Sequence, residues 1–82
     1  MPKIAENLII RKFGDEYFLL DSKEEKLHSL NETGSLIFSL LLKNFKKDAI
    51  AKKMATEYEI DDQTAFKDVE EFILVLSKKG II

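Results

Sequence analysis

The chain of 82 residues contains no cysteine, and this absence excludes disulfide bonds, thiolate metal sites and thiol nucleophiles together. A chain without cysteine suits a reducing compartment, so we expect a cytoplasmic protein. Residues 1–6 contain no apolar run long enough for a signal peptide. No stretch approaches the roughly 18 apolar residues of a membrane span, so the sequence predicts no membrane segment.

A surplus of positive charge is also lacking. The 13 Lys and Arg residues stand against 15 Asp and Glu residues, which makes the formal net charge −2. A free-standing nucleic-acid binder usually has a clear basic excess, so the composition argues against nucleic acid as a partner. His28 is the single histidine, whereas zinc takes three or four ligands. The three glycines are scattered and form no phosphate-binding loop. We therefore expect neither metal nor cofactor.

A catalytic constellation is equally absent from the sequence. A serine triad needs an elbow motif and a histidine partner, and neither is present at a useful spacing. Asp61 and Asp62 resemble a carboxylate pair, but they precede a predicted helix, where capping explains them better. Glu70 and Glu71 point about 100° apart on one helix and form no dyad. The sequence therefore predicts a binding protein and not an enzyme.

What the chain does have is a clear change of hydrophobic period. Hydrophobic residues make up 45% of the sequence, enough for one core, so we expect a single domain over residues 1–82, with residues 1–6 as a flexible tail. Segments 7–13, 16–21 and 26–30 read as strands of an antiparallel meander. From Asn31, which can cap a helix, the period becomes helical. Helices are predicted over about 32–43, 47–58 and 61–79, which gives an α+β fold.

The predicted helices differ in how much apolar surface they carry. The first has apolar residues on most sides, with Ser35 on the small exposed side, so we expect it to be covered by the sheet and by other helices. The third has an apolar arc of about 180°. Either both neighbours of this arc belong to the same core, or the flank from Phe66 to Ile73 lines a groove open to a ligand. An extended peptide could add to the meander's edge strand beside such a groove.

Three motifs occur in an order and at a spacing that resemble one known family. They read Leu30-Asn31-x-Thr33-Gly34-x-x-Ile37-Phe38-x-Leu40-Leu41, then Ile50-Ala51-x-x-Met54-x-x-Glu57-Tyr58-x-Ile60, then Asp68-Val69-x-x-Phe72-x-x-x-Leu76-x-x-x-Gly80-Ile81. This series is similar to the signatures of the PqqD family, named for pyrroloquinoline quinone biosynthesis protein D. One departure is Leu42-Lys43-Asn44, where the family has L-(D/E)-G. Asparagine can form the same left-handed helix stop.

The resemblance implies a winged-helix-like fold, with a three-stranded antiparallel sheet followed by three helices, and no catalytic activity. It also implies a peptide chaperone, or precursor-peptide recognition element, that binds the leader of a ribosomally made precursor peptide as an added strand. The leader is then presented to a modifying enzyme such as a radical S-adenosylmethionine protein or a leader protease. The implied edge and helix wall consist of Lys26, Leu27, His28, Ser29, Phe66, Val69, Glu70 and Ile73. The signature residues that look mainly structural are Leu30, Asn31, Phe38, Leu41, Phe72 and Leu76.

Two other functions stay open at this point. A winged-helix DNA-binding protein would need outward Lys or Arg on its recognition helix. The third helix instead carries many acidic residues, although the second helix does carry lysines. A docking subunit of a biosynthetic enzyme, without direct peptide contact, is the other alternative.

Overall fold

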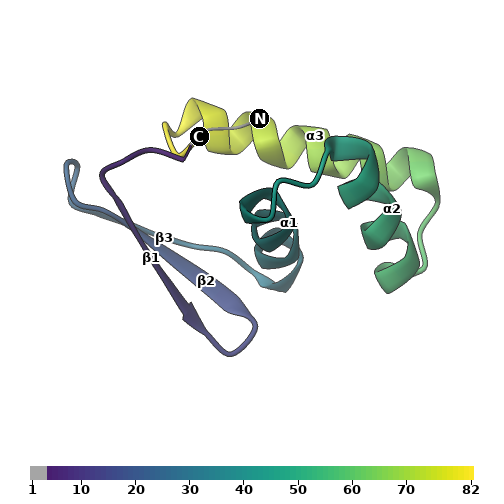
Figure 1. Ribbon diagram of the computed structural model, residues 1–82, viewed down its shortest axis with the longest axis horizontal. Helices are drawn as coiled ribbons and strands as arrows, with labels where there is room; N and C mark the ends of the chain where they lie inside the picture. The colour runs from purple at the N-terminus through teal and green to yellow at the C-terminus, as the bar shows by residue number, and fades with distance from the viewer. Residues whose placement is uncertain (1–3) are drawn as a thin grey trace.

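The computed structural model describes residues 4–82 and contains one sheet and three helices (Figure 1). The elements are β1 (Leu8–Phe13), β2 (Glu16–Asp21), β3 (Lys26–Ser29), α1 (Glu32–Leu42), α2 (Lys47–Tyr58) and α3 (Asp62–Lys78). The strands form an antiparallel sheet in the order β1-β2-β3. The predicted α+β fold is therefore confirmed, with element boundaries within one or two residues of those expected.

The two faces of the sheet have different surroundings. On one face Leu19 is fully buried, and the Tyr17 ring packs edge-on against Phe38 of α1 with the ring centroids 5.4 Å apart. The residues on the opposite face alternate with these along each strand. That face keeps several apolar side chains exposed, namely Ile9, Phe13, Leu20 and Leu27. Only the first face contributes to the core.

A buried carboxylate closes the turn between β2 and β3. Asp21 Oδ1 accepts hydrogen bonds from the backbone N–H groups of Lys23 and Glu24, each at 3.0 Å, and from the side-chain amide of Asn7. The bond from Glu24 above all lowers the pKa of Asp21 from its ordinary value, against the opposing effect of burial. The carboxylate therefore stays charged while it orders the turn that leads into β3.

The joint between β3 and α1 contains the cap predicted from the sequence and one polar contact that was not predicted. Asn31 Oδ1 accepts a hydrogen bond from the Gly34 N–H at 2.8 Å, which confirms Asn31 as the N-cap of α1. Ser35, expected on the exposed side of α1, is only 2% exposed. Its hydroxyl accepts from the Tyr17 N–H at 2.9 Å and donates to the Leu30 carbonyl at 3.1 Å. The expectation that Ser35 is exposed is thus wrong, because the sheet covers this side chain.

The end of α1 and both ends of α3 follow the stop and start signals predicted from the sequence. Asn44, just after α1, has a φ of 66°, which confirms the left-handed stop expected there. Asp61 caps α3 by accepting from the Thr64 N–H at 2.7 Å, and this hydrogen bond lowers the pKa of its carboxyl group. Gly80 has a φ of 74° and ends the third helix, after which Ile81 turns back into the core.

One core holds the elements together. Its buried side chains come from β2, the three helices and the residues that flank them, and they are Leu19, Leu30, Ile37, Phe38, Leu40, Leu41, Ile50, Ala51, Met54, Ala55, Ala65, Val69, Leu76 and Ile81. The pairs of elements that pack closely are β1–β2, β2–β3, α2–α3, α1–α2 and α1–β2. Within residues 4–82, no helix is long and apolar enough to span a bilayer.

The start of the chain was expected to be a flexible tail over residues 1–6. In the part that the structure describes, Ile4 is partly buried against the core, and the Ala5 N–H donates to the Ile81 carbonyl at 2.9 Å. Residues 4 and 5 are therefore fastened to the end of the chain. Of the other residues of the expected tail, Glu6 is exposed, and residues 1–3 lie outside the described residues.

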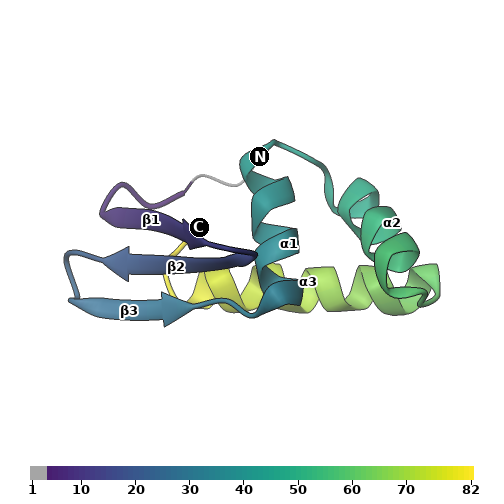
Figure 2. The ribbon, with the colours of Figure 1, turned by 90° about the horizontal axis from the view of Figure 1, so that it is seen from below.

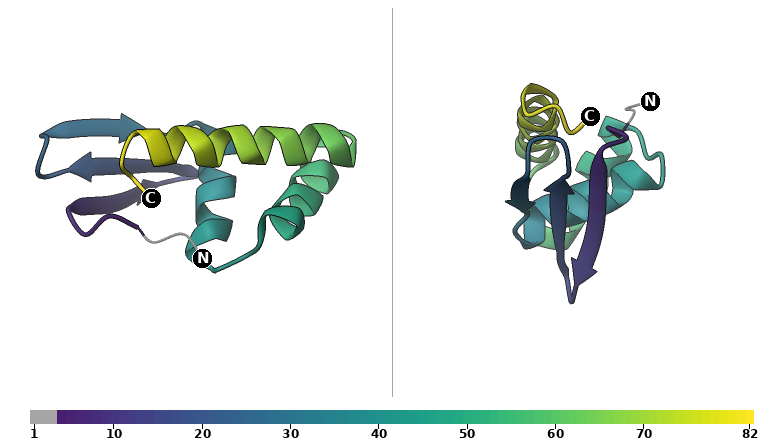
Figure 3. Two further views of the ribbon diagram at one scale, coloured as in Figure 1. Left: turned by 90° about the horizontal axis from the view of Figure 1, so that it is seen from above. Right: turned by 90° about the vertical axis from the view of Figure 1, so that its left-hand side faces the viewer.

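The long third helix sets the position of the candidate site. It packs on α2 near its start, and its C-terminal end lies beside the end of β3, where the chain passes into α1 (Figures 2 and 3). Yet β3 and α3 are not among the closely packed pairs of the described elements. Direct packing of comparable extent therefore does not join these two elements.

Candidate functional site

The third strand has one free side. The Leu30 N–H, just beyond β3, donates to the Tyr17 carbonyl of β2 at 2.9 Å. Backbone groups along an antiparallel strand point alternately to the two sides. His28 therefore also faces β2, whereas Leu27 and Ser29 direct their N–H and C=O groups away from the sheet. Among the described strands β3 pairs only with β2, so these groups are available to a further strand.

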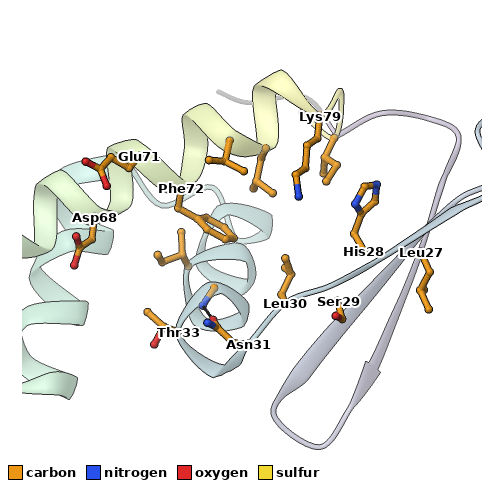
Figure 4. Close-up of a pocket in the computed structure, with 15 residues that line it drawn as sticks. Leu27, His28, Ser29, Leu30, Asn31, Thr33, Asp68, Glu71, Phe72 and Lys79 are labelled. Carbon is orange, nitrogen blue, oxygen red and sulfur yellow. Dashed lines mark hydrogen bonds between the residues drawn. The ribbon is translucent and has the colours of Figure 1, made fainter.

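A cleft of about 600 Å³ separates this free side from α3 (Figure 4). The strand contributes Leu27, His28 and Ser29, followed by Leu30. The side chains of α3 that line the cleft are Asp68, Glu71, Phe72, Val75, Leu76 and Lys79. The first turns of α1 and the C-terminal Ile81 complete it. The cleft is therefore apolar in its middle and polar at its two ends.

A glycine in α1 determines how deep the cleft is. A Cβ atom placed on Gly34 would lie 2.8 Å from Cε1 and 3.1 Å from Cζ of the Phe72 ring. Distances below 3.0 Å are not compatible with normal packing, so the ring could not keep its place if residue 34 had a side chain. The absence of a side chain at Gly34 thus lets the ring of Phe72 lie close against α1. Phe72 is half-buried and forms part of the cleft wall.

The charged residues of the cleft are separated along its length. Asp68 and Glu71 lie near Thr33 at one end, and Lys79 lies near His28 at the other (Figure 4). The ion pair found among residues 4–82, between Lys47 and Glu70 at 3.9 Å, is elsewhere on the surface. In the described part of the chain, no group of three or more His, Cys, Asp or Glu residues could hold a metal ion.

The strand residues predicted for the site lie beside the cleft. Leu27, His28 and Ser29 line it directly. Lys26 begins β3 and is exposed, but it is not among the residues that line the cleft.

The four residues predicted for the helix wall do not line this cleft. Val69 is fully buried, and Ile73 is partly buried and packs against the core. Phe66 and Glu70 border a different groove, which α3 forms with α2. At 100° per residue, the predicted wall and the actual lining differ by on the order of 140° around the helix. For Val69 and Ile73, the alternative in which the apolar arc serves the core is the correct one.

Several cleft residues were expected to be mainly structural. Leu30, Asn31, Phe72 and Leu76 line the cleft in addition to their packing or capping roles. The signal that could have identified the correct face is Val75, an apolar residue outside the core arc of α3. It is 46% exposed and lies in the middle of the lining.

Comparison with known proteins finds one matching family and two similar solved structures. The family model described as Coenzyme PQQ synthesis protein D (PqqD) matches residues 16–82. A solved structure described as TbiB1 in complex with the TbiA(beta) leader peptide is 28% identical to the chain, with a TM-score of 0.90 over 98% of this chain and 93% of that one. A second, a lasso peptide synthetase B1 complexed with the leader peptide, is 23% identical, with a TM-score of 0.90 over 96% and 93% of the two chains. Among curated proteins, no relative matches this chain.

Proposed function

Since the chain belongs to the PqqD family, we propose that it binds the leader segment of a ribosomally made precursor peptide as a strand added to β3, and presents that peptide to a modifying enzyme. The observation that carries this proposal is the outward direction of the Leu27 and Ser29 backbone groups beside an open cleft. The structure described as TbiB1, 28% identical to this chain, is a complex with a leader peptide. That likeness supports the same class of ligand here.

Strand addition would use both the backbone and the cleft. The peptide residues opposite Leu27 and Ser29 would exchange N–H and C=O hydrogen bonds with them. Every second peptide side chain would then point toward α3, where Phe72, Val75 and Leu76 offer apolar contacts. Main-chain bonds would supply sequence-independent affinity, and the apolar contacts would select the peptide.

Presentation to an enzyme leaves the chemistry to the partner. In this proposal the chain acts by binding, and the partner is an enzyme of leader-dependent peptide modification, such as a radical S-adenosylmethionine protein or a leader protease. The DNA-binding alternative is disfavoured by Asp68 and Glu71, whose charges on the open side of α3 would repel phosphates.

The proposal can be tested with a pair of neighbouring substitutions on α3. Val75 and Leu74 are both exposed apolar residues, 46% and 55% exposed, but only Val75 lines the cleft. The probe is a peptide selected against the wild-type protein from a displayed library of random peptides. Val75→Asp should weaken its binding roughly tenfold or more in calorimetry, because a carboxylate would be placed among apolar groups of the bound peptide. Leu74→Asp should leave the affinity unchanged.

Two outcomes would contradict the proposal. One is a selection from which no peptide with saturable binding emerges. The other is an equal loss of affinity in the Val75→Asp and Leu74→Asp proteins, which would place the peptide away from the cleft. Thermal unfolding of both variants checks that each remains folded, as their exposed positions lead us to expect.

A further inference from the structure

The separation of charge along the cleft makes its two ends chemically different. Asp68 and Glu71 place two carboxylates near Thr33, where β3 has passed into α1. Lys79 places an ammonium group near His28, in the middle of β3. All three side chains are exposed, and within residues 4–82 none of the three takes part in an ion pair. Their charges are therefore available to a bound ligand.

Other charged residues near the site do not cancel this arrangement. Lys26, at the start of β3, adds positive charge on the face of the strand that His28 shares, and the carboxylate of its register partner Asp21 offsets part of that charge. Glu24 and Glu25 belong to the preceding turn, and Glu32 begins α1, but none of the three is among the residues that line the cleft. The charged side chains that line the cleft thus change sign along it, from Lys79 on the side of His28 to Asp68 and Glu71 on the side of Thr33.

The register of the sheet determines which side chains of an added strand would meet these charges. In an antiparallel pair, directly opposite residues point to the same face of the sheet. His28 is the register partner of the buried Leu19, so His28 and Leu30 share the face toward α3, and Leu27 and Ser29 share the other. Ligand side chains opposite Leu30 and His28 would therefore enter the cleft, and one opposite Lys26 would lie on the same face just beyond it.

Ligand side chains at these positions would meet different groups of the protein. A ligand side chain opposite Leu30 would meet the apolar part of the wall, formed by Phe72 and Leu76. A side chain opposite His28 would lie on the side of Lys79, and one opposite Lys26 would lie beside the Lys26 side chain itself. The ligand chain that lies beyond Leu30, alongside Asn31 and Thr33, would meet Asp68 and Glu71. An antiparallel ligand runs from this acidic end toward the basic end.

We propose that the peptide segment recognised by this cleft has a defined order of charge: a basic side chain on the N-terminal side of an apolar residue, and an acidic side chain two or four residues after that apolar residue. This inference rests on the proposed function and specifies its ligand. The alternating spacing follows from the register, and the order follows from the direction of an added antiparallel strand. Asp68, Glu71 and Lys79 are then the residues that select the orientation of the peptide.

The expected change in peptide affinity is modest because the side chains of Asp68, Glu71 and Lys79 are exposed. Ion pairs between exposed side chains contribute little individually, so two or three of them should change affinity by roughly three- to tenfold. The preference should shrink as the ionic strength is raised from about 0.01 M to about 1 M, because the screening length falls from roughly 30 Å to roughly 3 Å. The added salt should weaken apolar contacts and backbone hydrogen bonds much less than it weakens the ion pairs.

The experiment compares the wild-type protein with a charge-swapped variant that carries Asp68→Lys, Glu71→Lys and Lys79→Glu. Both are used to select peptides from the same displayed library of random twelve-residue sequences. Wild-type protein should enrich peptides with a basic residue before the apolar position and an acidic residue after it, and the variant should enrich the reverse order. Two synthetic peptides of identical composition and opposite charge order then measure the preference by calorimetry, with the preferred peptide exchanged between the two proteins.

The outcomes separate this inference from the function on which it rests. If both proteins enrich peptides of the same charge order, or peptides without any order, the charge inference is overturned while peptide binding stands. If neither protein enriches any peptide, the proposed function itself is overturned. Loss of binding by the variant alone, with its fold intact by circular dichroism, would show that these charges are required for binding but do not set its orientation, which also overturns the inference.

Discussion

At the scale of single residues, the contact between Gly34 and Phe72 links the start of α1 to the cleft. The ring of Phe72 occupies the place that a side chain at residue 34 would need. Gly34 is buried in the first turn of a helix, where glycine is an unfavourable residue by up to about 1 kcal/mol relative to alanine. The chain thus carries a locally unfavourable residue at a position where close packing requires it.

Gly34→Ala should therefore weaken peptide binding with little net effect on stability. The added methyl group would push the Phe72 ring toward the cleft, while the gain in helix propensity offsets part of the packing cost. We expect a severalfold loss of affinity for a library-selected peptide in calorimetry. In a Phe72→Leu background, which lacks the clashing ring atoms, Gly34→Ala should raise the free energy of unfolding by up to about 1 kcal/mol. Identical effects in the two backgrounds would refute the proposed contact.

At the scale of elements, the passage from β3 into α1 depends on a buried hydroxyl group. Leu30 lies opposite Tyr17 in the register and donates its N–H to the Tyr17 carbonyl, so a regular ladder would return a bond from the Tyr17 N–H to the Leu30 carbonyl. The Ser35 hydroxyl bridges these two groups instead, because it accepts from the Tyr17 N–H and donates to the Leu30 carbonyl. This arrangement lets an edge strand feed directly into a helix without leaving buried backbone groups unpaired.

Ser35→Ala should destabilise the protein by about 1–3 kcal/mol, because it leaves a backbone N–H and a carbonyl without partners in the core. Ser39→Ala is the matched control on the same helix. Its hydroxyl donates at 2.8 Å to the carbonyl of Leu36 within α1 and is only half-buried, so its loss should cost within about 0.5 kcal/mol. Urea unfolding of the two variants measures the difference. A similar cost for both would mean that the Ser35 bridge contributes nothing specific.

At the scale of the whole molecule, the cleft exists because α3 is held away from β3 by other contacts. Its first half is packed on α2, and its end is held by Ile81, whose carbonyl accepts the hydrogen bond from Ala5. The helix is thereby held at both ends, while its second half lines the cleft beside the start of α1 and the end of β3. A preformed cleft of this kind reduces the conformational cost of binding an extended peptide.

Hydrogen exchange of the intact protein should report strand addition directly. The amides of Leu27 and Ser29 should exchange rapidly in the free protein, because they point away from the sheet, whereas the Leu30 amide is protected by its bond to Tyr17. Addition of a library-selected peptide should slow exchange at Leu27 and Ser29, with Leu30 as the internal reference. New protection confined to α2 would instead indicate docking at another surface.

Much of this architecture could be predicted because its signals are local. The change of period at Asn31, the asparagine cap, and the left-handed stops at Asn44 and Gly80 each depend on a few neighbouring residues. The free edge at β3 follows from the meander, in which sequential strands pair. These features are specified by local backbone preferences and by alternation, so one sequence was enough to place them.

The orientation of α3 depended on contacts between distant segments. Its apolar arc is wide enough for the helix to pack in more than one rotation about its axis. Packing on α2 and the close approach of Phe72 to Gly34 accompany the rotation that places Val69 in the core and Val75 in the cleft. The burial of Ser35 and the place of Phe72 over Gly34 likewise depend on where the sheet and α3 lie relative to α1. The sequence by itself determined the elements, their ends and the free strand edge. The tertiary structure alone decided which helix face meets that edge, because periodicity specifies a face but not its neighbour.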